Sequence, residues 1–126
     1  MITSGIDLVE IGRIERTIAR QGQRFLNRIF TPQEQAYCEG RAHQLAARFA
    51  VKEAVAKALG TGIGDMRWVE IEVVNNERGK PTLQLHGNAQ RIANEQHLHY
   101  WSISISHTDT HAIGQAVALK KVESGA

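Results

Sequence analysis

The sequence predicts an α+β domain in which a mostly antiparallel sheet packs against one long helix. Strand-like and helical segments alternate in the first half of the chain, whereas the second half contains two hairpin patterns, which favour antiparallel pairing. Residues 41–59 form a helical run rich in alanine and free of glycine and proline. These two observations together predict the fold class.

Four elements are expected before residue 60. Apolar residues predict a strand over 2–9, and apolar residues at helical spacing predict a helix over 10–21. The run from Thr31 to Glu34 matches a capping box with proline at the first helical position, so a short helix begins there. The long helix of residues 41–59 then ends at Gly60.

The rest of the chain predicts two hairpins and one further helix. Glycine content and alternation of apolar residues mark the boundaries. The expected elements are a flexible loop at 60–64, a strand at 67–74, a turn at 75–79, a strand at 82–86, a helix at 88–96, strands at 100–107 and 111–119, and a fraying tail at 120–126.

Composition predicts one folded domain spanning residues 1–126. Hydrophobic residues make up 42% and charged residues 22% of the chain, which excludes a disordered protein. We find no internal repeat, linker, signal peptide or segment of membrane-spanning length, so no membrane partner is expected. Cys38 is the only cysteine, which excludes an internal disulfide and fits a cytoplasmic location.

Positive charge is concentrated between residues 11 and 48. This segment carries seven arginines against three acidic residues, whereas the whole chain has a net charge of only +2. Such a stripe favours an acidic partner, and it is equally compatible with a solvated helix face. The arginines are Arg13, Arg16, Arg20, Arg24, Arg28, Arg41 and Arg48.

Two carboxylates occur in apolar surroundings. Asp7 lies within an apolar strand and shares its face with Gly5, whose small size leaves room beside the acid. Glu53 lies on an otherwise apolar face of the long helix, with Lys57 four residues later. Taken alone, Asp7 is best explained as an acid at the end of a strand, and Lys57 as the ion-pair partner of Glu53. Together, Asp7 and Glu53 form a pair that suits Mg²⁺.

Basic residues on the same helix fit a phosphate better than a structural salt bridge. We expect Arg48, Lys52 and Lys57 to surround an anionic ligand. The glycine-rich loop that follows lacks the Gly-Lys-Ser/Thr ending of a nucleotide P-loop and comes after a helix C-terminus, whose dipole disfavours anions. The histidine spacing does not match a zinc site. His107 at a strand end either touches a ligand or is merely solvated.

The ordered motifs resemble one family over nearly the whole chain. They are Gly5-x-Asp7, Arg13, Arg48-Phe49-Ala50-x-Lys52-Glu53-Ala54-x-x-Lys57-Ala58-x-Gly60-Thr61-Gly62, Gly79-Lys80-Pro81 and Ser104-Ile105-Ser106-His107-Thr108. Their order and spacing are similar to those of the holo-acyl-carrier-protein synthases, the short phosphopantetheinyl transferases. The resemblance implies the 4′-phosphopantetheinyl transferase fold.

The resemblance also implies a reaction. Members move 4′-phosphopantetheine from coenzyme A to a serine of apo acyl carrier protein, release adenosine 3′,5′-bisphosphate, and support fatty acid biosynthesis. By this resemblance Asp7 and Glu53 bind Mg²⁺, and Asp7, Glu53 and Lys57 are the catalytic residues. The family assembles as a homotrimer with sites between subunits. The implied coenzyme A contacts are Arg48, Lys57, Gly60, Thr61, Gly62, His107 and Thr108.

Two questions stay open at the level of sequence. The serine proton leaves either through a water held by Mg²⁺ or directly to Glu53. Residues Arg13, Arg20, Arg24, Phe25 and Arg28 are candidates for docking the acidic carrier protein. The alternative is a non-catalytic basic module that binds an acidic protein or nucleic acid. That alternative leaves Asp7, Glu53 and Lys57 unexplained and lacks aromatic stacking platforms, so no nucleic-acid partner is expected.

Overall fold

The structure is a computed structural model that describes residues 1–120. Of the tail expected to fray at 120–126, Lys120 instead ends the last strand, and residues 121–126 lie outside the described residues. The elements are, in order, β1 (Ile2–Glu10), α1 (Ile11–Gln21), α2 (Gln23–Ile29), α3 (Pro32–Cys38), α4 (Ala42–Leu59), the 3₁₀ helix η1 (Trp68–Glu70), β2 (Ile71–Asn75), β3 (Pro81–Leu85), α5 (Gly87–Glu95), β4 (Leu98–His107) and β5 (His111–Lys120).

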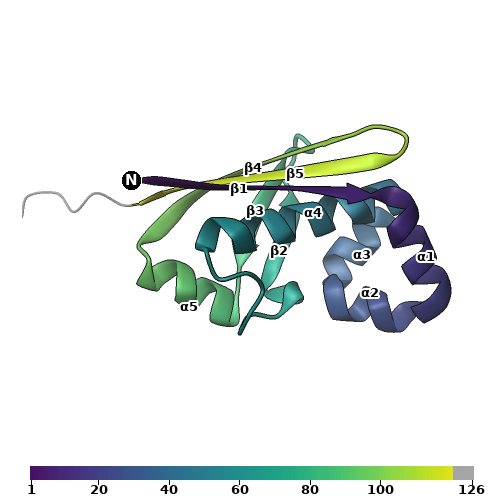
Figure 1. The fold of residues 1–126 in the computed structure, drawn as a ribbon, viewed down its shortest axis with the longest axis horizontal. Coiled ribbons are helices and arrows are strands. Elements are labelled where there is room, and N and C mark those ends of the chain that lie inside the picture. The colour runs from purple at the N-terminus through teal and green to yellow at the C-terminus, as the bar shows by residue number, and fades with distance from the viewer. Residues whose placement is uncertain (121–126) are drawn as a thin grey trace, which may run out of the picture.

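The main sheet is antiparallel and has the strand order β1-β5-β4. Helix α4 packs along one face of this sheet, with α1, α2 and α3 at one end and α5 at the other (Figure 1). Strands β2 and β3 pair antiparallel in a separate two-stranded sheet. The predicted α+β class, with a sheet against one long helix, is therefore confirmed.

Two glycines allow the sheet to lie close to α4. A Cβ atom on Gly5 would collide with the carbonyl oxygen of Ala54, and one on Gly114 would collide with the backbone of Ala50 and Val51. Ala50 and Ala54 are themselves fully buried. The space beside Asp7 that Gly5 was expected to leave for a ligand is thus occupied by the backbone of α4.

Two hydrophobic cores share α4. The first, here called the helical core, packs α1, α2 and α3 on the part of α4 from Leu45 to Ala50. The second, here called the hairpin core, packs β2, β3, α5 and the sheet on the part from Val51 to Leu59. Because α4 belongs to both cores, most of its side chains are buried, including residues of charged type.

Two sequence predictions were wrong in detail. Helix α2 was not predicted; Gly22, with φ of 57°, ends α1 and separates the two helices. The strand expected at 67–74 begins only at Ile71, because Glu70 folds back to accept a hydrogen bond from the Arg67 backbone N–H and closes the 3₁₀ turn η1. Within residues 1–120, no helix is long and apolar enough to cross a membrane.

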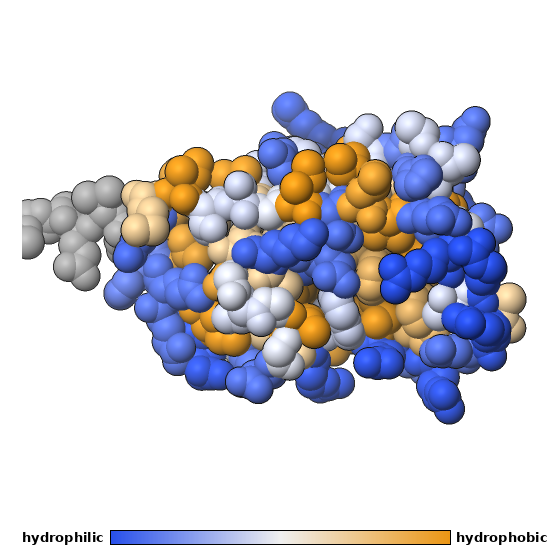
Figure 2. Space-filling model, viewed as in Figure 1, coloured by the Kyte–Doolittle hydropathy of each residue, from blue (hydrophilic) through white to orange (hydrophobic). Residues whose placement is uncertain are grey.

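The face of the main sheet that points away from α4 is exposed and apolar. Orange residues gather along the side of the molecule where this sheet lies (Figure 2). Ile2, Ile6, Leu8, Tyr100 and Leu119 are each about half exposed or more, at 49–63%. An exposed apolar surface of this kind is typical of a site that binds another molecule.

Candidate functional site

The fold brings the two predicted metal ligands into one electrostatic environment. Burial raises the pKa of Glu53, the carboxylate of Asp7 raises it further, and the charges of Lys57 and Arg13 lower it. Asp7 comes from β1 and Glu53 from α4, which pack directly against each other. The site therefore combines two acids and two basic groups from β1, α1 and α4.

Lys57 pairs with Asp7 instead of with Glu53. Its Nζ atom donates to Asp7 Oδ1 at 3.1 Å and to the Ile6 carbonyl oxygen at 2.9 Å. The Lys57 side chain is 52% exposed and that of Asp7 is 19% exposed. Glu53 takes part in none of the five ion pairs within residues 1–120. Its carboxylate is thus available for another ligand.

The two carboxylates fit a hard divalent cation that takes most of its ligands from water or a bound molecule and few from the protein. Asp7 and Glu53 offer carboxylate oxygens, and the described residues contain no cluster of three or more His, Cys, Asp or Glu side chains able to hold a metal. Mg²⁺ is commonly bound by one or two carboxylates, with phosphate oxygens and water as the remaining ligands. Zinc sites use three or four protein ligands and do not match this set.

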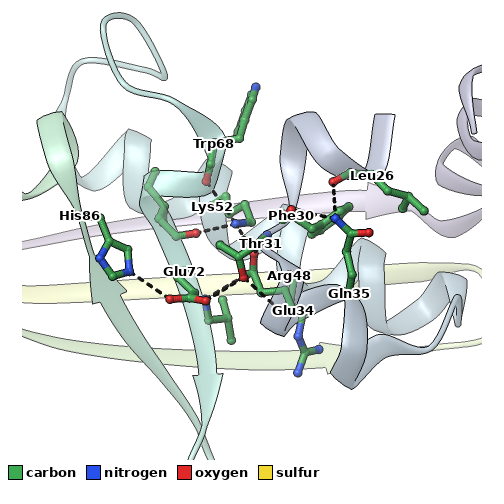
Figure 3. A network of polar contacts seen from close by, with 12 residues as sticks. Leu26, Phe30, Thr31, Glu34, Gln35, Arg48, Lys52, Trp68, Glu72 and His86 are labelled. Atoms are coloured by element: carbon green, nitrogen blue, oxygen red, sulfur yellow. Dashed lines mark hydrogen bonds and ion pairs between the residues drawn. The ribbon is translucent and has the colours of Figure 1, made fainter. Parts of the chain in front are cut away.

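Lys52 is a structural residue, and the expectation that it contacts a phosphate is wrong. Its side chain is fully buried, and its Nζ atom donates to Glu34 Oε1 at 2.8 Å (Figure 3). Burial lowers the pKa of Lys52, and the negative charge of Glu34 opposes this effect. A buried ammonium that already has its counter-ion cannot reach a soluble ligand.

Arg48 is also buried within this chain, and its contact with coenzyme A stays a prediction. The residue is 2% exposed. Its guanidinium donates to Gln44 Oε1 at 2.8 Å and to Asn75 Oδ1 at 2.6 Å, and it lies over the Tyr37 ring at 4.5 Å. Among the described residues its Nε atom is buried without a hydrogen-bond partner. Arg48 therefore links α4 to the end of β2.

The remaining coenzyme A candidates lie at the two ends of α4. Gly60, Thr61 and Gly62 are exposed directly after its last residue. His107 and Thr108 lie at the turn between β4 and β5, which Figure 1 shows at the opposite end of the molecule from α5. A helix of 18 residues is about 27 Å long. Within one chain, the two groups are therefore far apart.

The turn between β4 and β5 borders a hollow that the sequence did not reveal. The hollow has a volume of about 410 Å³ and is lined by Ile11, Glu15, Ala42, His43, His107, Thr108 and Asp109. The rings of His43 and His107 lie with their centroids 5.0 Å apart. No local signal marks His43, because only the packing of α4 against the sheet brings it beside His107.

The arginines of the stripe are exposed except for Arg48, whereas Phe25, the expected apolar centre of the docking surface, is buried. Arg13, Arg20, Arg24 and Arg28 are exposed on α1 and α2. A shallow hollow of about 600 Å³ on α1 is lined by Arg13, Arg16, Thr17, Ala19, Arg20 and Gln21. Phe25 is only 9% exposed and packs edge-to-face on Phe30 within the helical core. It therefore offers no surface for docking.

Comparison with known proteins gives consistent matches. A sequence model of the 4′-phosphopantetheinyl transferase superfamily matches residues 4–116. The chain is 46% identical to the holo-[acyl-carrier-protein] synthase of Herpetosiphon aurantiacus, over 94% of this chain and 99% of that protein. It is 48% identical to the protein of the same name from Trichlorobacter lovleyi, over 90% of this chain and 93% of that one.

Solved structures match equally well. The holo-[acyl-carrier-protein] synthase of Neisseria meningitidis superposes with a TM-score of 0.87 at 36% identity, covering 95% of this chain and all of that one. The Helicobacter pylori synthase, solved in complex with coenzyme A, superposes with a TM-score of 0.84 at 34% identity, covering 94% of this chain and all of that one.

Proposed function

The chain belongs to the 4′-phosphopantetheinyl transferase superfamily, and we propose that it transfers 4′-phosphopantetheine from coenzyme A to a serine of apo acyl carrier protein, in support of fatty acid biosynthesis. The observation that supports this most is the meeting of Asp7, Glu53 and Lys57 at the junction of β1 and α4. A non-catalytic basic module would give these three groups no role.

The reaction exchanges one oxygen on phosphorus for another and releases the proton of the serine hydroxyl. The serine oxygen of the carrier bonds to the β-phosphorus of coenzyme A, and the bond from that phosphorus to the oxygen of adenosine 3′,5′-bisphosphate breaks. Mg²⁺ bound to Asp7 and Glu53 would withdraw charge from the pyrophosphate. Such reactions depend mainly on positioning and on neutralisation of charge.

The chain's own groups have distinct tasks in this scheme. The ammonium of Lys57 is half exposed, so water can solvate it while it turns from Asp7 to a phosphate oxygen. Glu53 has a raised pKa because of burial and of Asp7, which suits a carboxylate that accepts the serine proton directly or through a water molecule.

We further propose a homotrimer with active sites between subunits. Two features support it. The exposed apolar face of the main sheet would be buried by contact with a neighbouring subunit. In addition, the coenzyme A candidates at Gly60–Gly62 and at His107–Thr108 lie at opposite ends of α4, so a single ligand would take one group from each of two neighbouring chains.

The exposed arginines of α1 and α2 would bind the acidic carrier protein. One of them, Arg13, also acts on the pKa of Glu53, so the docking surface would adjoin the active site. We place the reaction in the cytoplasm, in keeping with a lone cysteine, Cys38, that is free and buried.

A direct assay tests the proposed function. The protein is mixed with coenzyme A, Mg²⁺ and apo acyl carrier protein, and the carrier is weighed by mass spectrometry. The carrier should gain the mass of one phosphopantetheine in the presence of Mg²⁺ and none in the presence of EDTA. A carrier that stays unmodified with Mg²⁺ would refute the transferase, and modification in EDTA would refute the metal requirement.

A further inference from the structure

Lys52 is surrounded by acceptors from three elements. Its Nζ atom donates to Glu34 Oε1 on α3 at 2.8 Å, to the Trp68 carbonyl of η1 at 3.1 Å and to the Ile71 carbonyl of β2 at 2.6 Å. An ammonium group has three N–H donors, and here each one has an acceptor. The side chain is therefore held from all sides, with no donor left for a ligand.

Glu34 is equally well satisfied. Its Oε1 atom also accepts from the Thr31 N–H at 2.9 Å, and its Oε2 atom accepts from the Val73 N–H of β2 at 3.0 Å. The Thr31 hydroxyl continues the network to Glu72 at 2.7 Å, and Glu72 contacts His86 at 3.0 Å (Figure 3). The capping box of α3 is thus part of a polar network that ends at the molecular surface.

The network lies where the two cores meet. Glu34 belongs to α3, which packs in the helical core, whereas Ile71 and Val73 belong to the hairpin core. Lys52 comes just after Val51, where α4 passes from one core to the other. The three contacts of this one ammonium, to α3, η1 and β2, therefore restrict the rotation and the height of α4. Two apolar side chains would fill the same volume without dehydrating two charges, but they would fix no such orientation.

We propose that the buried pair of Lys52 and Glu34 is a positioning device that sets the rotation of α4 and thereby holds Glu53 against Asp7. Glu53 follows Lys52 directly in the chain, so any rotation of α4 at Lys52 moves its carboxylate relative to β1. Lys52 is therefore a positioning residue of the reaction and not a group that touches the substrate. This inference rests on the proposed metal pair of Asp7 and Glu53.

The test compares two double variants. Lys52→Met with Glu34→Gln removes both buried charges and keeps the volumes similar. Arg91→Met with Glu95→Gln removes the exposed ion pair of α5 and serves as the matched control. Each protein is checked by circular dichroism and thermal unfolding, and Mn²⁺ binding without coenzyme A is measured by electron paramagnetic resonance. The kcat and the KM for coenzyme A are then determined.

The buried double variant should fold, bind Mn²⁺ more weakly and lose kcat by up to about 10²-fold, the scale of a misplacement of about 1 Å at a reacting centre. The KM for coenzyme A should change far less. The control should match the wild type in every measurement. If the buried double variant lacks the native circular dichroism spectrum, Glu34→Gln alone, which preserves shape and one acceptor oxygen, is tested with the same measurements.

Two results would overturn the positioning role. One is a folded variant with wild-type Mn²⁺ affinity and kcat, since the pair would then serve stability alone. The other is an equal loss of kcat in the α5 control. An Asp7→Asn variant separates the inference from its premise. Unchanged Mn²⁺ binding by Asp7→Asn overturns the metal pair itself, whereas lost binding there, with full binding in the buried double variant, overturns only the positioning role.

Discussion

Lys52 and Lys57 lie five residues apart on α4, and each is paired with a carboxylate, yet their surroundings are opposite. The side chains of Lys52 and Glu34 are both fully buried, whereas Lys57 is 52% exposed over Asp7. A buried ammonium depends on its counter-ion, because water no longer solvates it. An exposed one is free to exchange partners. The comparison teaches that burial, and not residue type, separates the structural Lys52 from Lys57, which we propose acts in catalysis.

The largest expected difference between the two lysines is in stability, and it is tested by removing each lysine alone. Lys52→Met leaves Glu34 buried without its partner and should lower the free energy of unfolding by about 3–5 kcal/mol. Lys57→Met removes an exposed pair and should lower it by less than about 1 kcal/mol. Urea unfolding followed by circular dichroism measures both values. Similar losses in the two variants would contradict the distinction.

Turnover should depend on Lys57, although its removal changes the free energy of unfolding little. Lys57→Met should keep its fold and lose about 10²–10³-fold in kcat, the scale of one lost charge-stabilising contact. The matched control is Lys80→Met, which removes an exposed lysine from the turn before β3. Phosphopantetheine transfer is followed by mass spectrometry at saturating coenzyme A. Near-normal turnover of Lys57→Met would remove Lys57 from the catalytic residues.

The comparison extends to two arginines. Arg24 is exposed on α2, whereas Arg48 is 2% exposed and bonded to Asn75. Arg24→Glu should raise the KM for the acidic carrier several-fold more than the KM for coenzyme A, and the effect should shrink at high salt. Arg48→Met should instead lower the melting temperature. Equal changes in both KM values for Arg24→Glu would count against docking by α2.

The smallest expected effect concerns pH. A carboxyl group with a raised pKa binds more protons in the folded than in the unfolded chain, so its ionisation destabilises the fold as pH rises above the ordinary value of 4.5. Glu53→Gln should therefore raise the melting temperature slightly at pH 7.5 without metal, and this gain should vanish near pH 4. Thermal scans at both pH values provide the measurement. A lower melting temperature of the variant at pH 7.5 would show that Glu53 is stabilising when ionised.

Local patterns in the sequence were sufficient for most elements. The capping box from Thr31 to Glu34 is present as predicted, and both predicted hairpins form, although the first strand of the earlier hairpin begins only at Ile71. The proximity of Asp7 and Glu53 comes from the packing of β1 on α4, and their use as a metal pair stays a prediction. Each carboxylate by itself is conspicuous, because its neighbours in the sequence are apolar. Such signals extend over one turn of helix or a few residues of strand, which is the range that periodicity and capping describe.

The sequence by itself determined the α+β class, the long helix and the family to which its motifs belong, because these depend on local periodicity and on ordered motifs. Only the tertiary structure decided which basic residues are free. Lys52 meets Glu34 across 18 positions, Lys57 meets Asp7 across 50, and Arg48 meets Asn75 across 27. The burial of each charge depends on these distant contacts, and no local pattern specifies them.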